Sequence, residues 1–108
     1  MPKLGEFELL VLLSILRHPD VPYANRVRDD LEANAGRSVT RGALYRTIDR
    51  LTEKRFLEWE LEPSEVPDRG GHPMRRLIVT AAGLAAVRDT RDVLATFFDG
   101  LDPVLEDA

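Results

Sequence analysis

The sequence contains no cysteine, and this absence excludes a disulfide framework, a cysteine-based metal site and a cysteine nucleophile. The only two histidines, His18 and His72, are far apart and do not have the spacing of metal ligands. The longest apolar stretch, Leu9 to Leu16, is interrupted by Ser14 and is much shorter than the roughly 20 residues that cross a bilayer. We therefore expect no metal, no cofactor and no membrane partner.

Two further absences concern export and catalysis. The first residues lack the pattern of a secretory signal peptide, because the acidic Glu6 and Glu8 lie where an apolar segment would begin. The expected location is therefore the cytoplasm. Ser14, Ser38 and Ser64 have no histidine and acidic residue at plausible positions for a catalytic triad, so no catalytic residue is identified and an enzyme is not expected.

The charge of the chain is unevenly distributed along its 108 residues, a length typical of one domain. The net charge of −4 opposes a nucleic-acid partner. Residues 37–55, however, carry six basic side chains against two acidic ones, so this segment has a charge of +4 and the remainder −8. A basic segment on an acidic body could still bind phosphates while the body orients the encounter.

Apolar periodicity predicts two helices at the start of the chain. The first covers Leu4 to Arg17 and is apolar over most of its circumference, so it needs cover on two sides. The second covers Tyr23 to Asn34 and is followed by Gly36, which can end it in a left-handed conformation. Its outer face is predicted to carry the acidic residues Asp29, Asp30 and Glu32.

A third helix is predicted from about Arg41 to Lys54, with Thr40 as its N-cap. The residues of its buried stripe are spaced by four and three positions: Leu44, Ile48 and Leu51. The residues that point the opposite way are Gly42, Arg46, Asp49 and Glu53, with Tyr45 and Arg50 on the flanks. Small, aromatic and cationic groups on one outer face are typical of a helix that binds duplex DNA.

The second half of the chain contains two predicted strands and a last helix. Leu57 to Glu62 alternates between apolar and acidic residues, which indicates a half-buried strand with its glutamates in solvent and Trp59 in the core. Pro63 to Pro73 is predicted to be a loop, and Met74 to Val79 a second strand that completes a β-hairpin. Thr80 is predicted to cap a helix that ends at about Phe98.

The order of helix, helix, helix, strand, loop, strand and helix is that of a winged helix-turn-helix with an added C-terminal helix. The predicted fold class is therefore mainly α with a small β-hairpin, which forms the wing. Residues 1–80 make up the predicted DNA-binding domain. Residues 81–108 make up a C-terminal dimerisation helix and an acidic tail, and the tail from Asp99 to Ala108 is expected to be loosely held.

Five segments follow one another in a specific order and spacing. They are Leu4-Gly5-Glu6-Phe7-Glu8, Tyr23 with Leu31-Glu32, Gly42-Ala43-Leu44-Tyr45 leading to Asp49-Arg50-Leu51, Arg69-Gly70-Gly71, and Val79-Thr80-Ala81-Ala82-Gly83. Together they resemble the PadR family of transcriptional regulators, in particular its short members with one C-terminal helix, over roughly residues 4–88. The resemblance implies a homodimer that binds operator DNA through the third helix and the wing and dimerises through the first and last helices.

Four positions depart from that family. Arg55 stands where the family usually has a glycine after the third helix, and a left-handed non-glycine residue would cost about 1 kcal/mol, so a rearranged cap is expected. In the wing, His72 replaces a usual arginine, Met74 a usual lysine and Arg76 an aromatic residue. Cationic contacts to DNA are therefore expected to be partly lost at positions 72 and 74 and only partly restored by Arg75 and Arg76.

The predicted DNA contacts of the third helix combine base and phosphate binding. Gly42 would permit close backbone approach, and Arg46 would bind a guanine edge with two hydrogen bonds. Basic residues near the positive end of a helix are unfavourable without an anion, which indicates a phosphate there. The residues of this set are Arg37, Thr40, Arg41, Gly42, Tyr45, Arg46 and Arg50. The alternative is a surface helix on which Arg46 pairs with Asp49.

The wing is predicted to contact the minor groove or the DNA backbone. Its contact residues are Arg69, Gly71, His72 and Arg75. The alternative is a loop whose arginines pair with its own acidic residues, Glu65 and Asp68.

The apolar surplus of the first and last helices predicts a dimer interface, and the alternative is a single intramolecular core. The interface residues are Leu9, Leu13, Leu16, Leu84, Val87, Leu94, Phe97 and Phe98. The leading hypothesis is a homodimeric, sequence-specific regulator of transcription, a repressor, that binds double-stranded operator DNA. A small-molecule effector of unknown identity, sensed between the last helices, is a further candidate partner. The rival hypothesis is a winged-helix module that has lost DNA binding and serves protein interaction or dimerisation.

Overall fold

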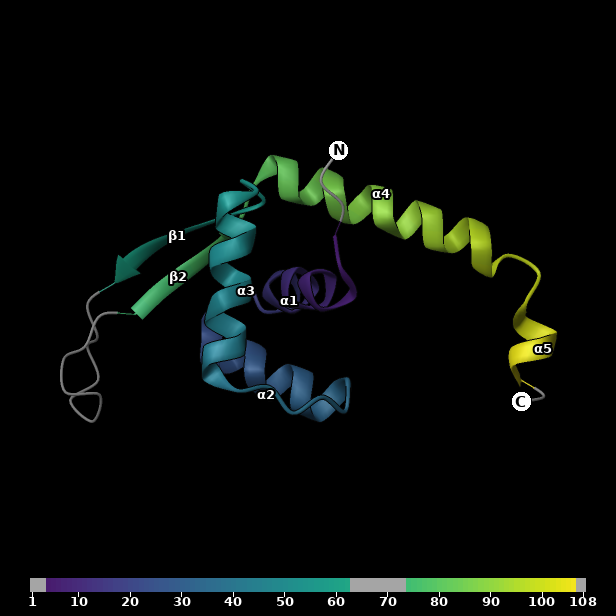
Figure 1. Cartoon of the computed structure of the whole chain (residues 1–108), viewed down its shortest axis with the longest axis horizontal. Coiled ribbons are helices and arrows are strands. Elements are labelled where there is room, and N and C mark those ends of the chain that lie inside the picture. The colour runs from purple at the N-terminus through teal and green to yellow at the C-terminus, as the bar shows by residue number, and fades with distance from the viewer. Residues whose placement is uncertain (1–3, 63–73, 107–108) are drawn as a thin grey trace.

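The computed structural model describes residues 4–62 and 74–106. Within these residues, three helices precede a two-stranded hairpin, a long helix and a short last helix (Figure 1). The elements are α1 (Glu6–Arg17), α2 (Ala24–Asn34), α3 (Arg41–Glu53), β1 (Leu57–Glu62), β2 (Met74–Val79), α4 (Ala81–Phe98) and α5 (Asp102–Glu106). The predicted order and fold class are confirmed, and only α5 was not predicted.

Both α3 and α4 begin at the threonine that was expected to cap them. The Thr40 hydroxyl accepts a hydrogen bond from the Ala43 amide at 3.1 Å, and the Thr80 hydroxyl accepts one from the Gly83 amide at 3.0 Å. Each bond satisfies an N–H group that the first turn of a helix leaves unpaired. The Thr80 hydroxyl also donates to the Arg55 carbonyl at 2.7 Å, which joins the start of α4 to the end of α3.

The segment after α3 contains a left-handed residue that is not glycine. Arg55 has a φ of 65°. The Phe56 amide donates to the Leu51 carbonyl at 3.0 Å, and the Arg55 amide donates to the Thr52 carbonyl at 3.0 Å. These two bonds make up the Schellman motif, in which glycine usually takes the left-handed position. The expectation of a rearranged cap is therefore wrong: the cap is kept, and a strain of about 1 kcal/mol falls on Arg55.

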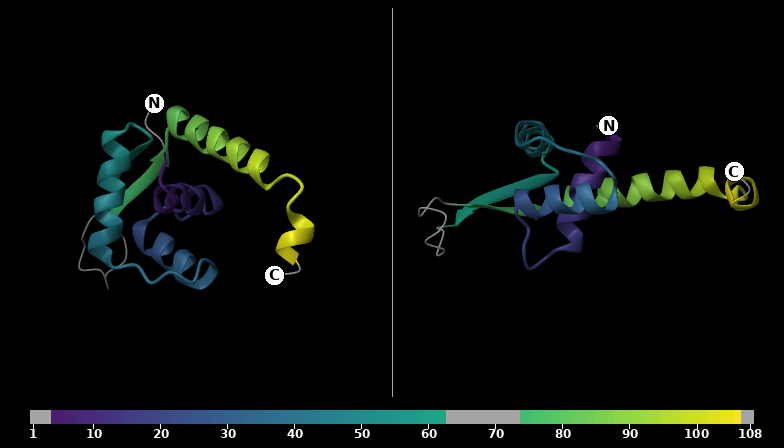
Figure 2. Two further views of the ribbon diagram at one scale, coloured as in Figure 1. Left: turned by 45° about the vertical axis from the view of Figure 1, so that its right-hand side comes forward. Right: turned by 90° about the horizontal axis from the view of Figure 1, so that it is seen from below.

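The core lies where the first three helices and the base of the hairpin meet. The stripe that was predicted for α3 is fully buried, since Leu44, Ile48 and Leu51 each have 0% exposure. The core residues are Val11, Leu12, Ile15, Val27, Leu31, Leu44, Ile48, Leu51, Phe56, Leu57 and Leu77. Because this cluster covers one face of α3, the opposite face lies at the outside of the molecule, where the second view shows α3 end-on (Figure 2, right).

The hairpin pairs β1 with β2 in antiparallel register, with Leu57 opposite Val79 at its base. The Leu77 amide donates a hydrogen bond to the Pro22 carbonyl at 2.9 Å. This bond joins the free edge of β2 to the segment before α2. The hairpin is therefore attached to the segment before α2 as well as at its base, and its strands run outward from the core (Figure 1).

Burial along β1 decreases with distance from that base. Leu57 has 0% exposure, whereas Trp59 has 36% and Leu61 has 59%. The prediction of a core position for Trp59 is therefore wrong. It assumed that the core extends along the whole apolar face of the strand, whereas the hairpin extends beyond the cluster that covers Leu57.

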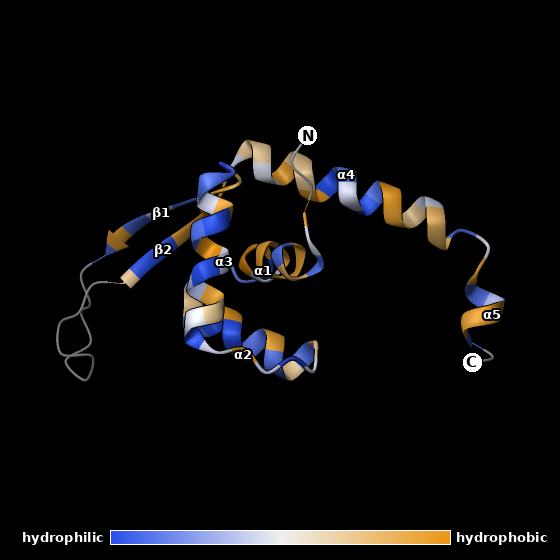
Figure 3. Cartoon of the chain, in the orientation of Figure 1, coloured by the Kyte–Doolittle hydropathy of each residue, from blue (hydrophilic) through white to orange (hydrophobic). Residues whose placement is uncertain are grey.

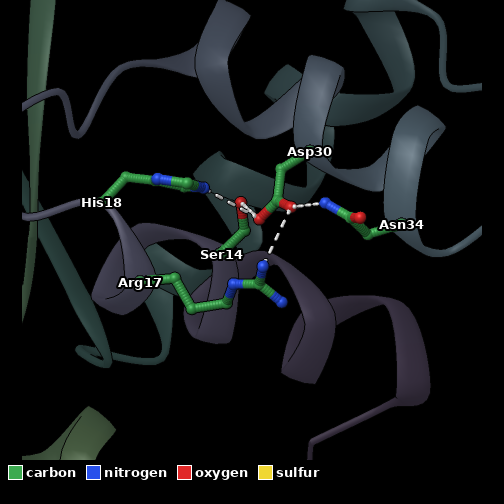
Figure 4. A network of polar contacts seen from close by, with 5 residues as sticks. All are labelled: Ser14, Arg17, His18, Asp30 and Asn34. Atoms are coloured by element: carbon green, nitrogen blue, oxygen red, sulfur yellow. Dashed lines mark hydrogen bonds and ion pairs between the residues drawn. The ribbon is translucent and has the colours of Figure 1, made fainter.

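Asp30 was expected on the outer face of α2, and this expectation is wrong, since its side chain is only 6% exposed. Its carboxylate accepts hydrogen bonds from the Ser14 hydroxyl at 2.7 Å and from the Asn34 amide at 2.6 Å (Figure 4). Nitrogen atoms of His18 and Arg17 lie 3.2 Å and 3.7 Å from it. The Ser14 hydroxyl, then the Asn34 amide, and also Arg17 and His18 hold the pKa of Asp30 below its usual value against the effect of burial.

A second buried carboxylate, that of Glu8, joins the start of α1 to the end of α3. The Lys54 ammonium lies 2.9 and 2.8 Å from its two oxygens, and the Gly5 amide donates to it at 2.8 Å. Burial raises the pKa of Glu8, but the Lys54 hydrogen bonds and charge, with the Gly5 amide, outweigh burial and leave this pKa below its usual value.

The C-terminal arm, which consists of α4 and α5, extends away from the other elements (Figures 1 and 2). Its first turn packs so closely that a Cβ atom at Gly83 would lie 2.2 Å from the Phe56 carbonyl oxygen, so this position requires glycine. The radius of gyration is 15.9 Å, compared with about 13 Å for a compact domain of this length. The difference reflects the projection of the arm.

The arm exposes several large apolar side chains, and apolar residues alternate with polar ones along its ribbon (Figure 3). These side chains are Leu84, Val93, Leu94, Phe97, Phe98, Leu101, Val104 and Leu105. In α5, Pro103 occupies the first turn, where its missing N–H costs no helical hydrogen bond. None of the helices that the structure describes is both long enough and apolar enough to cross a membrane.

The buried charge of Asp30 predicts a pH-dependent loss of stability in the variant Asp30→Asn. At pH 7 the free energy of unfolding should fall by about 1–3 kcal/mol, because the amide has one acceptor oxygen and no charge and so cannot keep both hydrogen bonds of the carboxylate. A carboxyl group with a lowered pKa in the folded state stabilises the protein above its unfolded pKa of about 3.9, and this stabilisation is lost as the pH falls through the folded pKa. The difference between wild type and variant should therefore shrink below about pH 4.

Urea unfolding followed by far-UV circular dichroism at several pH values, at one protein concentration, measures this difference. The matched control is Asp29→Asn, because Asp29 is the exposed neighbour of Asp30 on the same helix. This control should change the free energy of unfolding by no more than about 0.5 kcal/mol. A difference for Asp30→Asn that stayed constant from pH 7 to pH 3 would show that the charge of Asp30 does not stabilise the fold.

Candidate nucleic-acid interface

The outer face of α3 is arranged as the sequence predicted. Gly42, Arg46, Asp49 and Glu53 are exposed, and Tyr45 on the flank is partly buried against the core. The opposite side of the helix consists of the buried stripe. The face therefore presents one small residue, one aromatic ring and both signs of charge to solvent.

Arg46 has no ion-pair partner among the residues that the structure describes, and its side chain is exposed. The alternative prediction paired it with Asp49, one turn further along the helix. Instead, Asp49 lies 3.5 Å from the Arg75 guanidinium of β2. The Arg46 guanidinium lies near Gly42, where a Cβ atom would be 3.6 Å from it. Among the described residues, no acidic side chain therefore neutralises the charge of Arg46.

The start of α3 is shaped by two arginines outside the helix. The Arg28 guanidinium donates a hydrogen bond to the Val39 carbonyl at 3.1 Å, and this bond fixes the extended segment that leads into Thr40. Arg37, a predicted phosphate contact, forms an ion pair with Glu6 and lies over the Phe7 ring at 5.4 Å from its centroid. Arg37 therefore has an internal acidic partner.

Two further predicted contacts of α3 point into solvent. Arg41 in the first turn and Arg50 near the last turn are both exposed. Arg50 also contributes to the lowered pKa of Glu8 through its charge. Together with Arg46 they place three guanidinium groups along 13 residues of one helix.

Arg75 lies between α3 and the hairpin. Its guanidinium carbon is 4.3 Å from the centroid of the Trp59 ring and 5.3 Å from that of the Tyr45 ring. With the Asp49 carboxylate at 3.5 Å, the group contacts residues of α3 and β1 at once. The sequence predicted a DNA contact for Arg75, whereas these internal partners were not predicted.

Three other residues of the wing were predicted to contact DNA. Arg69, Gly71 and His72 lie outside the described residues. Arg76, on the opposite face of the hairpin from Arg75, lies 3.4 Å from Glu62.

Glu62 was expected on the solvated side of β1 with Glu58 and Glu60; those two are exposed, and the Glu62 side chain is 36% exposed but also has partners within the chain. Its carboxylate accepts a hydrogen bond from the Tyr23 hydroxyl at 2.7 Å. This bond, followed by burial, raises the pKa of Tyr23. The far end of β1 is thereby joined to the start of α2, a contact between residues 39 positions apart that no local sequence pattern indicates.

The residues predicted for a dimer interface lie on α1 and on the C-terminal arm. Leu13, Leu16, Leu84, Leu94, Phe97 and Phe98 are exposed, and Leu9 is partly buried. Val87 is also partly buried, and it packs against the core of its own chain. Phe97 has 76% exposure, the highest value among the large apolar side chains that the structure describes.

No protein-family model matches the chain, and neither does any curated protein. Solved structures do match. A PadR-like transcription factor from Bacteroides fragilis gives a TM-score of 0.74 at 22% identity, over 93% of this chain and 90% of that chain. A PadR family transcriptional regulator from Eggerthella lenta gives 0.67 at 23% identity, over 95% and 88%. A protein from Streptococcus mutans gives 0.69 at 13% identity, over 98% and 94%.

These matches extend over nearly the whole length of both chains, so the likeness includes the C-terminal arm as well as the three helices and the hairpin. At identities between 13% and 23%, the likeness concerns the fold. The sequence resemblance implied the same arrangement. The chain therefore has the fold of PadR-like transcriptional regulators, a winged helix-turn-helix followed by a C-terminal helix.

Proposed function

We propose that this protein is a sequence-specific DNA-binding regulator of transcription. The observation that supports the proposal most strongly is the outer face of α3, where Arg46 is exposed beside Gly42 and has no ion-pair partner among the described residues. The helix that carries this face is capped at Thr40 and held by a fully buried stripe. A rigid helix with a free guanidinium group on its outer side fits the major groove of duplex DNA.

In this proposal, the first turns of α3 bind bases and its ends bind phosphates. Gly42 lets the helix backbone approach the base edges, and Arg46 reaches a guanine with two hydrogen bonds. Tyr45 donates its hydroxyl to the DNA backbone, and the unpaired amides at the N-terminus of α3 beside Thr40 bind a phosphate. Arg41 and Arg50 add charge on either side. Residues 1–80 form the DNA-binding unit.

The distribution of charge supports an oriented encounter with DNA. Residues 37–55 have a charge of +4, and the rest of the chain has −8. Phosphates therefore attract α3 and repel the remainder of the surface. Working on genomic DNA, the protein would be cytoplasmic, as the sequence suggested.

We further propose that residues 81–108 join two copies of the chain. The apolar side chains of the C-terminal arm are too many and too exposed for a stable monomer, since Phe97, Phe98 and Val104 are each more than half exposed. A symmetric dimer through the arm and α1 would bury them and place two α3 helices on one side of the duplex. Repression then follows from occupation of a promoter, as the resemblance to PadR regulators implies.

One observation favours a second function, that of an interaction module without DNA binding. Of the arginines predicted to contact DNA from outside α3, Arg37 and Arg75 both have acidic partners within the chain. If these pairs persist, fewer cationic groups remain for phosphates than in a typical winged helix. The proposed function therefore depends on α3 itself.

DNA binding can be tested by fluorescence anisotropy with operators selected from a random duplex library, at several salt concentrations. Wild-type affinity should fall steeply with salt. Arg46→Ala should weaken binding to the selected operator by about 1–3 kcal/mol and remove the preference for guanine at one position in each half-site. The control Arg88→Ala removes the same charge from an exposed position on α4 and should leave the base preference unchanged.

Gly42→Ala provides a variant in which weaker binding cannot arise from weaker folding. An added Cβ atom meets only the flexible Arg46 guanidinium at 3.6 Å, and alanine is the better helix former by about 1 kcal/mol. We expect a more stable protein that binds DNA less tightly. Equal affinity of the wild type for selected and random DNA at 50 mM salt would contradict the proposed function and support the interaction module.

The dimer can be tested by sedimentation equilibrium. The wild type should sediment at micromolar concentration with twice the chain mass of 12.2 kDa. Phe97→Asp should shift this equilibrium to the monomer, because a charge would be buried without a partner in the interface. Val21→Asp is the control, since Val21 is also an exposed apolar residue but lies outside the arm and α1. A wild type that sediments only as a 12.2 kDa species would refute the dimer.

A further inference from the structure

Arg75 makes three contacts that together connect the wing to the outer face of α3. We propose that Arg75 is a positioning residue for DNA binding. Its guanidinium forms an ion pair with the Asp49 carboxylate, and this pairing leaves Arg46 free to bind DNA. The stacking of the same guanidinium on aromatic rings fixes the hairpin against α3. In this role Arg75 contacts no DNA itself. The inference rests on the proposed function and assigns a mechanism to one side chain within it.

The geometry places the guanidinium among partners from two elements. The group lies 4.3 Å from the centroid of Trp59 on β1 and 5.3 Å from that of Tyr45 on α3. One of its nitrogens lies 3.5 Å from the Asp49 carboxylate of α3. That nitrogen is buried and makes no hydrogen bond to the residues that the structure describes. Its partners therefore cover this nitrogen, whereas the Arg75 side chain as a whole is 33% exposed.

The strand register explains why Arg75 and Trp59 meet. Arg75 is opposite Leu61, and Trp59 is opposite Leu77. Residues that are opposite one another share a face of an antiparallel pair, and a diagonal neighbour is within reach of a long side chain. A planar guanidinium can stack on an aromatic face and keep an ionic contact at its edge, which the compact ammonium of lysine cannot do in the same way.

The position of Asp49 explains why its carboxylate needs an ion-pair partner other than Arg46. Asp49 follows Arg46 by three residues on the helix, so their side chains are neighbours. An unoccupied carboxylate there would attract the Arg46 guanidinium and repel the phosphates that flank the groove. In the structure Asp49 is next to Arg75 instead, and Arg46 has no ion pair among the described residues. The contact with Arg75 therefore determines which arginine remains free.

The first experiment needs no DNA, because Trp59 is the only tryptophan of the chain. Acrylamide, a neutral quencher, reports the exposure of its ring. Arg75→Ala should raise the quenching constant, since the guanidinium no longer covers the ring. Arg75→Lys should also raise the quenching constant, although it keeps the positive charge. This conservative variant serves if Arg75→Ala fails to fold. Arg91→Ala on α4 is the control and should leave quenching unchanged.

The second experiment measures affinity for the selected operator in Arg75→Ala, Asp49→Asn and the double variant. Arg75→Ala should lose about tenfold in affinity, because it exposes the negative charge of Asp49 beside Arg46. Asp49→Asn in the same chain should restore most of that loss. The slope of log affinity against log salt should then return close to that of the wild type.

Two results would overturn the inference. If Arg75 contacted a phosphate, its loss would reduce the salt slope by about one contact and Asp49→Asn would not restore affinity. Unchanged quenching in both Arg75 variants would show that the guanidinium does not stack on Trp59 in solution. Failure of the wild type to prefer its operator would instead refute the proposed function, whereas unchanged quenching with normal operator binding refutes the role of Arg75 alone.

Discussion

Leu44, Ile48 and Leu51 bury one face of α3 completely, and the orientation of the proposed DNA-binding face depends on this contact. Each of these side chains contributes about 1.5–3 kcal/mol when it leaves water, so the helix cannot rotate about its axis without a large loss. With the stripe fixed against α1 and the base of the hairpin, the residues one half-turn away have to face solvent. The outward position of Gly42 and Arg46 is thus a direct consequence of core packing.

Polar contacts then fix the angles between the helices, which apolar packing alone leaves adjustable. Asp30 joins α1 to α2, and the Glu8–Lys54 pair joins α1 to the end of α3. Both carboxylates are buried and hydrogen-bonded, so each contact has a defined geometry, and leaving either charge without its partner would be costly. Through these contacts α1, which carries part of the surface proposed for dimerisation, is held in place against α2 and α3. The relative placement of α3 and this surface determines how two recognition helices could meet one duplex.

The fold could be predicted from the sequence because its signals are local. The spacing of Leu44, Ile48 and Leu51, the capping threonines Thr40 and Thr80, and the alternation of β1 each depend on residues a few positions apart. Asp30 was misplaced because its burial depends on Ser14, 16 residues away in the sequence. Trp59 was misplaced because strand alternation identifies a face and not how far the core extends along it.

The candidate site was predictable only in part for the same reason. The helical wheel predicted which residues of α3 face outwards, and the structure agrees for Gly42, Arg46, Asp49 and Glu53. The partner of Asp49 could not be predicted, because it comes from β2 and depends on the strand register and on the angle between hairpin and helix. The sequence shows which charged side chains are present. Only the three-dimensional arrangement shows which of them form ion pairs with one another.

The proposed binding of Arg46 to the major groove can be measured by methylation interference on a selected operator. Methylation at guanine N7 blocks the major-groove edge of that base. We expect one guanine in each half-site, about 10 base pairs apart, whose methylation abolishes binding by the wild type and has little further effect on binding by Arg46→Ala. Binding that is insensitive to guanine N7 methylation, or equally sensitive in both proteins, would contradict it.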